Sequence, residues 1–201
     1  MREYPEIDVS DGVYPPSDDT YLLLDAINFK AEDSVLDVGC GAGLGTVIAA
    51  CKASSVVGID ISLDAAKNTA ANLKRNNMER TAGVVQSDLL SAISSRSKFS
   101  IILFNPPYLP ADDNSTMMDH AHIGGKLGSE LTQKFIGQAS RHLIDGGELF
   151  VVVSTLADTS TVMKAFRNYG FQIERVAEKS LFFEKIQVLR GIFRGQKETV
   201  L

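Results

Sequence analysis

The chain has 201 residues and a formal net charge of −5, with 44% hydrophobic and 22% charged residues. This length suits one α/β domain with a single sizeable core, and no apolar run reaches the roughly 18 residues that a membrane span requires. The first residues lack the apolar segment of a secretory signal, so a cytoplasmic location is expected. The negative net charge argues against a nucleic acid as the main partner, because proteins that bind nucleic acids usually carry a basic patch. It does not exclude a nucleic acid.

Short apolar runs alternate with helical patterns from about residue 12, after an amino-terminal arm that is expected to be loosely held. Strands are predicted at 34–39, 55–60, 83–88, 99–105, 148–154, 171–179 and 182–193. Helices are predicted at 43–52, 63–76, 129–143 and 157–168, with a polar loop at about 111–126. The alternation predicts a Rossmann-like, doubly wound sheet of about seven strands. The sheet is expected to be mostly parallel, with a C-terminal antiparallel hairpin, in a single domain spanning residues 1–201. Such sheets bind ligands at the carboxyl ends of their strands.

A glycine-rich loop follows the first predicted strand, with the sequence Asp37-Val38-Gly39-Cys40-Gly41-Ala42-Gly43-Leu44-Gly45. A dinucleotide fingerprint needs Gly-x-Gly-x-x-Gly, and the last glycine of that pattern is missing here. The alternating glycines resemble instead the cofactor loop of class I methyltransferases, which passes the methionine part of S-adenosylmethionine. The resemblance implies that Asp37 lies near the amino group of that cofactor. A tight turn without a ligand is the alternative.

Acidic residues also end the second and third predicted strands. Asp60 can accept hydrogen bonds from both hydroxyls of a ribose, as in related nucleotide-binding sheets, or it can serve only as an acid favoured by a helix dipole. The resemblance to class I methyltransferases implies that Asp88 and Leu89 lie where the side chain usually faces the adenine amino group, and a plain helix cap is the alternative. The two cysteines, Cys40 and Cys51, have neither metal-ligand nor redox spacing, so no metal site is predicted and Cys40 is read as a small filler.

The fourth predicted strand leads into Asn105-Pro106-Pro107-Tyr108. Two adjacent prolines cannot extend a central strand, so the chain must leave the sheet here with fixed φ angles. An amide or aniline-like nitrogen is a poor nucleophile, and an enzyme that methylates it must align it and stabilise the growing positive charge. The side-chain oxygen of Asn105 and the carbonyl of Pro106 can accept its two N–H bonds, and Tyr108 can stack on the planar target. The alternative is an ordinary Asn-Pro turn.

The glycine loop and the Asn-Pro-Pro-Tyr tetrapeptide together resemble the amino-methyltransferases that act on adenine, cytosine or glutamine. The segment from Gly12 to Ala26, GVYPPSDDTYLLLDA, narrows this resemblance. It is similar to the amino-terminal segment of the short eukaryotic and archaeal HemK-type glutamine methyltransferases, whose bacterial relatives carry an extra helical domain. The stretch from Gly124 to Gly128 echoes a Gly-Gly-x-x-Gly stretch of that family, so the resemblance covers nearly the whole chain.

The resemblance implies methylation of the glutamine side chain in the Gly-Gly-Gln tripeptide of a translation release factor. It also implies a small zinc-binding activator protein as a partner and places Thr20 near the methionine end of the cofactor. Taken on its own, Ser17-Asp18-Asp19-Thr20 also fits an ordinary helix start, so Thr20 can be a cap instead. Ser17-Asp18 stands where the relatives often have Ala-Glu, and the histidines His120 and His122 are expected to face solvent rather than a metal.

Two other functions remain open at this point. Methylation of adenine N6 on DNA or RNA would use the same Asn105 site, because that nitrogen is also planar, but it requires a nucleic-acid surface and a flipped base. A non-catalytic, cofactor-binding scaffold is the second alternative, and the intact tetrapeptide argues against it. The predicted catalytic residues are therefore Asn105, Pro106 and Tyr108. The predicted cofactor contacts are Thr20, Asp37, Gly39, Gly41, Gly43, Asp60, Asp88, Leu89 and Asn105.

Overall fold

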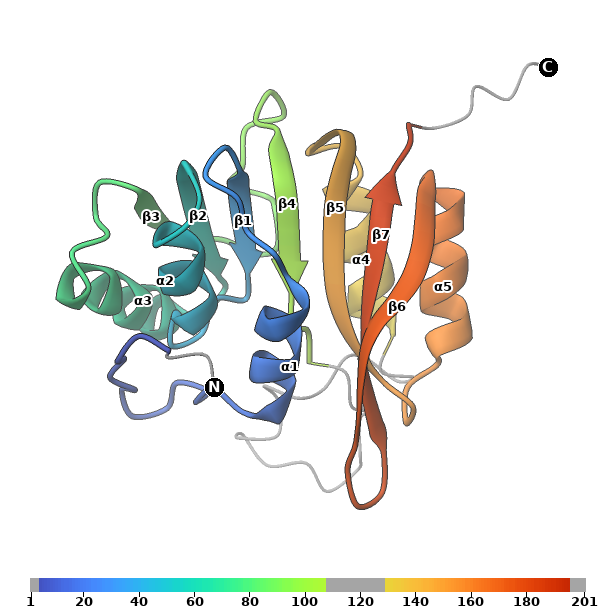
Figure 1. Ribbon diagram of the computed structural model, residues 1–201, viewed down its shortest axis with the longest axis horizontal. Helices are drawn as coiled ribbons and strands as arrows, with labels where there is room; N and C mark the ends of the chain where they lie inside the picture. The colour runs from blue at the N-terminus through green and yellow to red at the C-terminus, as the bar shows by residue number, and fades with distance from the viewer. Residues whose placement is uncertain (1–3, 108–128, 196–201) are drawn as a thin grey trace.

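The computed structural model describes residues 4–107 and 129–195, which form one seven-stranded sheet with helices on both faces (Figure 1). The strands are β1 Ser34–Val38, β2 Ser55–Asp60, β3 Ala82–Gln86, β4 Phe99–Phe104, β5 Leu143–Ser154, β6 Phe171–Ser180 and β7 Lys185–Phe193. The helices are α1 Asp18–Ala26, α2 Leu44–Ala50, α3 Leu63–Arg75, α4 Glu130–Ala139 and α5 Thr159–Asn168. The predicted loop at 111–126, its two histidines, the stretch from Gly124 to Gly128 and Tyr108 lie outside the described residues.

The strand order β3-β2-β1-β4-β5-β7-β6 confirms the predicted doubly wound sheet. The pairs β1–β2, β1–β4, β2–β3 and β4–β5 are parallel, whereas β7 pairs antiparallel with both β5 and β6. Strands that are buried on both faces are expected to be continuously apolar, and FSIILF of β4 fits this with Ser100 as its single polar residue. The predicted C-terminal antiparallel hairpin is therefore β6–β7.

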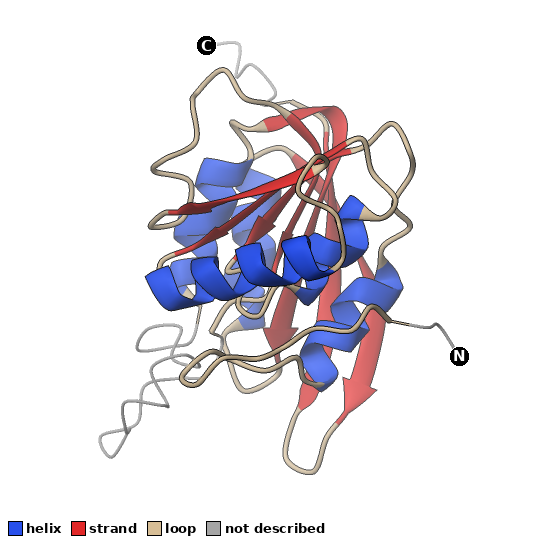
Figure 2. Ribbon diagram, turned by 90° about the vertical axis from the view of Figure 1, so that its left-hand side faces the viewer, coloured by secondary structure: helices blue, strands red, loops and turns tan. Residues whose placement is uncertain are grey.

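The helices cover both faces of the sheet (Figure 2), and an apolar layer joins them to each face. One layer joins α1, α2 and α3 to one face and includes Leu24, Val47 and Leu73, which are almost fully buried. The other joins α4 and α5 to the opposite face through Phe135 and Phe166, both fully buried. No helix in the described part of the chain is long and apolar enough to cross a membrane.

The central strands end at one edge of the sheet. Val38 at the end of β1 is paired with Ile59 of β2 on one side and with Phe104 of β4 on the other. Because parallel strands place their carboxyl ends at the same edge, the loops that follow these three residues converge there.

The amino-terminal arm, defined here as residues 4–12, is not loosely held from Tyr4 onward, and that prediction was wrong. Asn68 and Asn72 of α3 bind its backbone: the amide N–H of Asp8 donates to Oδ1 of Asn72 at 2.8 Å, and the N–H of Ser10 donates to Oδ1 of Asn68 at 2.7 Å. Both amide nitrogens donate back to the carbonyl of Asp8. Side-chain amides one helical turn apart thus give the arm the partners that a neighbouring strand would provide.

The helix predicted at 129–143 is also shorter than expected. It ends at Ala139, and β5 begins at Leu143 instead of residue 148. The cause is pairing with β4, since the N–H of Phe99 donates to the carbonyl of His142 at 2.8 Å and Phe99 is in register with Leu143. The register then shifts between Phe99 and Ile101, which accommodates the glycine-containing turn that was predicted to end the helix.

Candidate active site

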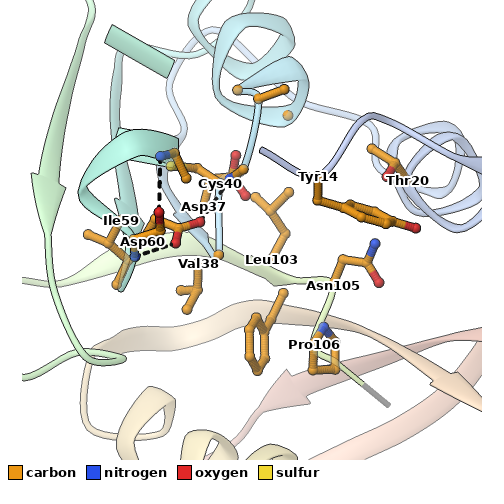
Figure 3. A pocket seen from close by; sticks show the side chains of 18 of the residues that line it. Tyr14, Thr20, Asp37, Val38, Cys40, Ile59, Asp60, Leu103, Asn105 and Pro106 are labelled. Atoms are coloured by element: carbon orange, nitrogen blue, oxygen red, sulfur yellow. Dashed lines mark hydrogen bonds between the residues drawn. The ribbon is translucent and has the colours of Figure 1, made fainter. Parts of the chain in front are cut away.

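A cavity of about 460 Å³ lies at the carboxyl ends of β1, β2, β3 and β4 (Figure 3). Its volume falls within the roughly 300–1,000 Å³ that is usual for small-molecule sites. Its lining includes every predicted site residue that the structure describes: Thr20, Asp37, Gly39, Gly41, Gly43, Asp60, Asp88, Leu89, Asn105 and Pro106. Tyr108 is the predicted site residue that lies outside the described part.

The glycine loop bends around one side of this cavity with left-handed backbone angles. Gly39, Gly41 and Gly43 have φ values of +66°, +55° and +90°. At Gly43 a Cβ atom would also meet Thr69 at 2.9 Å, so no other residue fits without displacing α3. At these three glycines, which line the cavity, no side chain stands between the backbone and a ligand.

Asp37 is buried at the end of β1, where Oγ1 of Thr46 donates a hydrogen bond of 2.7 Å to its Oδ2. A Cβ atom on Gly45 would lie 2.8 Å from the same oxygen, so α2 approaches this carboxylate closely. Burial raises the pKa of Asp37 to about 7; the Thr46 bond opposes the rise, and the charge of Asp60 adds to it. A cationic group in the cavity would therefore find a carboxyl that gains strongly from ionic pairing.

Asp60 connects the ends of β2 and β1. Its Oδ2 accepts from the N–H of Gly41 at 3.0 Å, and its Oδ1 accepts from the N–H of Ser62 at 2.9 Å. Ser62, rather than Asp60, caps α3, because its Oγ accepts from the N–H of Ala65. Each carboxylate oxygen has a further lone pair, so an orientation fixed by two backbone bonds leaves acceptors for a diol.

The end of β3 is held in an uncommon conformation. Leu89 has φ +48°, which side-chain-bearing residues rarely adopt and which costs of the order of 1–3 kcal/mol at functional sites. The hydroxyl of Ser87 donates to the carbonyl of Leu89 at 2.7 Å, and Oε1 of Gln138 accepts from the N–H of Leu90. No α-helix lies between β3 and β4, both of which are described together with the chain between them, so Asp88 is not a helix cap.

Asn105 leaves β4 with its side chain turned toward the cavity (Figure 3). Its Oδ1 is buried and has no hydrogen-bond partner within residues 4–107 and 129–195. An unpartnered buried acceptor costs about 1–3 kcal/mol, which a folded protein tolerates where a ligand provides the donor. Beneath it, Phe104 packs on Phe135 with ring centroids 4.3 Å apart, which fixes the point where the chain leaves the sheet.

Thr20 takes part in the helix start as well as the cavity wall. Its Oγ1 accepts from the N–H of Ser17 at 3.3 Å and donates to Oδ1 of Asp19 at 3.2 Å. The capping role is therefore present in the structure, and contact with a cofactor remains a prediction.

Tyr14 is a cavity residue that sequence reasoning missed. Its ring lies beside Asn105 in Figure 3, and its hydroxyl donates to Oδ2 of Asp19 at 3.4 Å. Burial is the main cause of a raised pKa for Tyr14, which keeps the phenol neutral. Tyr14 belongs to the segment from Gly12 to Ala26, whose sequence shows only a family resemblance. Its place in the cavity depends on how α1 packs on the sheet, which the sequence pattern does not show.

Cys40 is confirmed as a buried residue rather than an exposed thiol. The hydroxyl of Thr69 donates to its sulfur at 3.3 Å, and burial raises the pKa of the thiol. A protonated, enclosed sulfur is a poor nucleophile, as a filler role requires.

The donors and acceptors around the cavity fit a molecule of mixed chemistry. The cavity is lined by three such groups: an ionisable carboxyl at Asp37, a carboxylate at Asp60 that two backbone bonds hold in place, and an unpartnered amide oxygen at Asn105. This set suits the amino group and the ribose diol of S-adenosylmethionine, together with a separate N–H donor at Asn105.

Comparison with known proteins gives matches over most of the chain. The family model described as "Methyltransferase small domain" matches residues 16–182. A putative protein N5-glutamine methyltransferase of Methanocaldococcus jannaschii is 34% identical over 89% of this chain and 91% of the relative. A release factor glutamine methyltransferase of Agrobacterium fabrum is 29% identical over 86% of this chain and 65% of the relative.

Solved structures share the fold. The E. cuniculi Mtq2–Trm112 complex, described as methylating the termination factor eRF1, aligns with a TM-score of 0.68 and 24% identity, covering 90% of this chain and 98% of that chain. The T. thermophilus 16S rRNA methyltransferase RsmC, solved with AdoMet and guanosine, aligns with a TM-score of 0.66 and 22% identity, covering 92% of this chain and 45% of that chain.

Proposed function

This chain belongs to the methyltransferase small domain family and is an S-adenosylmethionine-dependent methyltransferase, and we propose that its acceptor is the side-chain amide nitrogen of glutamine. The observation that carries the proposal is the buried Oδ1 of Asn105, which is turned into the cavity without a hydrogen-bond partner among the described residues. The 34% identity to a relative named for glutamine N5-methylation supports the choice of acceptor.

The proposed chemistry uses few groups of the protein. S-adenosylmethionine supplies a methyl group on a sulfonium, a strong electrophile with a neutral leaving group. Oδ1 of Asn105 and the carbonyl of Pro106 accept the two N–H bonds of the glutamine amide, which turns the nitrogen lone pair toward the incoming methyl group. The same two oxygens would stabilise the positive charge that grows on nitrogen as the N–CH3 bond forms and the S–CH3 bond breaks, so that S-adenosylhomocysteine is the neutral leaving group. The methylated nitrogen would then lose one proton to water. The predicted stacking by Tyr108 belongs to this proposal.

We assign the cofactor contacts by the chemistry of each group. Asp37 and the glycine loop would hold the methionine part, with Thr20 at its far end, and Asp60 would accept from the ribose hydroxyls. Asp88 and Leu89 would flank the adenine. The residues on which this assignment depends all line one cavity. We propose that they belong to a single domain spanning 1–201, because the described strands form one sheet.

The proposed substrate is a translation release factor methylated at its Gly-Gly-Gln glutamine, so the protein would act in translation termination in the cytoplasm. The name of the Agrobacterium fabrum relative supports this choice. We further propose a small zinc-binding activator subunit, by analogy with the Mtq2–Trm112 assembly. Co-purification of such a partner with the tagged chain, followed by metal analysis of the complex, would test that subunit.

The acceptor can be tested directly. The wild-type chain, supplied with labelled S-adenosylmethionine, should transfer one methyl group to the Gly-Gly-Gln glutamine of a release factor, detected by mass spectrometry of the tryptic peptide. Asn105→Ala should lose transfer, because Asn105 holds the acceptor amide in this proposal, and cofactor affinity should fall far less than transfer, because Asn105 is only one of the nine predicted cofactor contacts. Asn168→Ala, at an exposed position at the end of α5, provides the matched control. If the label enters only DNA or RNA, the acceptor is adenine and the glutamine proposal is wrong.

A further inference from the structure

The turn between β6 and β7 exposes two adjacent phenylalanines. Phe182 is 99% exposed and Phe183 is 90% exposed, more than any other large hydrophobic side chain in the described part of the chain. Their rings lie next to each other, with centroids 6.1 Å apart. Single exposed hydrophobic residues are common, but two fully exposed aromatic side chains side by side mark an interaction site.

The turn that carries them, residues 181–184, is anchored and is named here the hairpin tip. The N–H of Leu181 donates to the carbonyl of Glu184 at 2.8 Å, which closes the turn. The carboxylate of Glu184 accepts a hydrogen bond from the hydroxyl of Ser154. Lys185 and Thr155 exchange two further hydrogen bonds of 2.9 and 3.0 Å. The hairpin tip is thereby attached to the end of β5, and the aromatic rings project from a fixed base.

The hairpin tip lies at the same edge of the sheet as the cavity. Ser154 pairs with Ile186, and Phe104 pairs with Val151, so the turn projects beyond the edge where Asn105 leaves β4 (Figure 1). An ion pair of 2.8 Å between Lys179 and Asp18 joins β6 to the start of α1, whose Thr20 lines the cavity. Leu156, which is also exposed, follows β5 at this edge. The two exposed rings and Leu156 therefore lie at the same edge of the sheet as the active-site cavity.

We propose that the hairpin tip docks the folded protein that carries the acceptor glutamine, an inference that rests on the proposed function. A glutamine side chain alone offers the enzyme little surface, so additional contacts must come from the rest of the acceptor. Phenylalanine rings gain from contact with an apolar protein surface and have no polar group to satisfy.

The charges around the tip favour a protein over a polyanion. Lys179 is ion-paired with Asp18, and Lys185 is ion-paired with Glu178. Glu184, at the tip itself, would repel a phosphate backbone or an anionic lipid surface. The apolar tip with its paired cations therefore fits an uncharged or mildly basic apolar patch next to the acceptor loop.

The test compares two acceptors with one double variant, F182S/F183S. The acceptors are the purified release factor and a short synthetic peptide that contains its Gly-Gly-Gln sequence but cannot reach the tip. With the whole factor, the variant should show a KM raised about tenfold or more, as expected for loss of a central aromatic contact, at an unchanged kcat. With the peptide, KM should match that of the wild type. Ile144→Ser is the control, because Ile144 is 46% exposed but lies at the opposite, amino-terminal end of β5.

The outcomes separate the docking inference from the proposed function. A wild-type enzyme that methylates neither acceptor would overturn the proposed function, and the inference would fall with it. Docking alone would be overturned if the wild-type enzyme methylates the factor and the double variant has the same KM for it. It would also be overturned if the double variant raises KM equally for the factor and the peptide. Docking would equally be overturned if the substitutions abolished only dimer formation in sedimentation, or only binding to anionic vesicles or oligonucleotides. Because both rings are exposed, the thermal midpoint of the variant should equal that of the wild type.

Discussion

Replacing Asp37 with asparagine should stabilise the cofactor-free protein at neutral and alkaline pH. The carboxyl is buried, and burial is the main reason that its pKa rises from 3.8 to about 7. Asparagine has nearly the same shape and stays neutral, and its amide oxygen can accept the hydrogen bond that Thr46 now donates to Oδ2. The variant therefore removes the cost of ionising a buried group while it keeps the local hydrogen bond.

The pKa values set the size and sign of this effect. The pKa of Asp37 is higher in the folded protein than in the unfolded chain, so the folded state binds this proton more tightly. The resulting stabilisation is complete below about pH 3.8 and is lost as the pH rises through about 7. Three pKa units at about 1.36 kcal/mol each correspond to about 4 kcal/mol. The difference in unfolding free energy between variant and wild type should thus be near zero at pH 4 and reach about 4 kcal/mol, in favour of the variant, at pH 8.

Urea unfolding of both proteins at intervals between pH 4 and pH 8 measures this difference, since other titrating groups cancel in the subtraction. A difference that does not change with pH, or a variant that is less stable at pH 8, would refute the reasoning. Asp37→Asn should at the same time weaken binding of S-adenosylmethionine, because the ionised carboxyl is the proposed partner of its amino group. Stability gained together with affinity lost is the signature of a strained binding residue.

Three further substitutions test other parts of the structure. Asp60→Ala should weaken cofactor binding by about 1–3 kcal/mol, the usual loss for a buried hydrogen-bond partner, and unchanged affinity in calorimetry would exclude the ribose role. Asn72→Ala removes the hydrogen bonds from this side chain to the arm and to the carbonyl of Ala42. The substitution should lower the unfolding free energy by about 2–4 kcal/mol and make the arm sensitive to protease. An arm that stays resistant to protease would show that other contacts hold it. Asn77→Gly should raise the unfolding free energy by about 0.5–1 kcal/mol, since Asn77 follows the C-cap of α3 with φ +58°, and an unchanged denaturation midpoint would show that asparagine has no conformational cost there.

The sequence predicted the parts of the fold that apolar patterning controls. The run FSIILF identified β4, and the alternation of strands and helices was enough to place the ends of β1, β2 and β4 at one edge. Because the cavity lies at that edge, the strand ends were enough to place Asp37, Asp60 and Asn105 beside it, whereas the role expected for Asp37 came from the resemblance. The start of β5 at Leu143 could not, because exposed and glycine-containing residues there lack an apolar run and pair through the backbone.

The packing of the arm was beyond prediction for a related reason. Asn68 and Asn72 are spaced one helical turn apart, which ordinarily indicates a solvent-exposed polar face of a helix. Their partners are backbone groups of Asp8 and Ser10, about sixty residues away, and backbone groups carry no sequence signature. The place of Tyr14 in the cavity depends on the same long-range arrangement.

The position of β7 between β5 and β6 has a consequence for synthesis of the chain. Among residues 4–107 and 129–195, β7 is the last strand, and it must enter between two strands that are made before it. In that part of the chain, β6 therefore has no partner strand until β7 forms. During translation, β5 therefore presents an unpaired, strongly apolar edge until residue 193 has left the ribosome, a state prone to aggregation. Nascent chains halted before β7 should engage chaperones, whereas release of the whole strand should end that dependence.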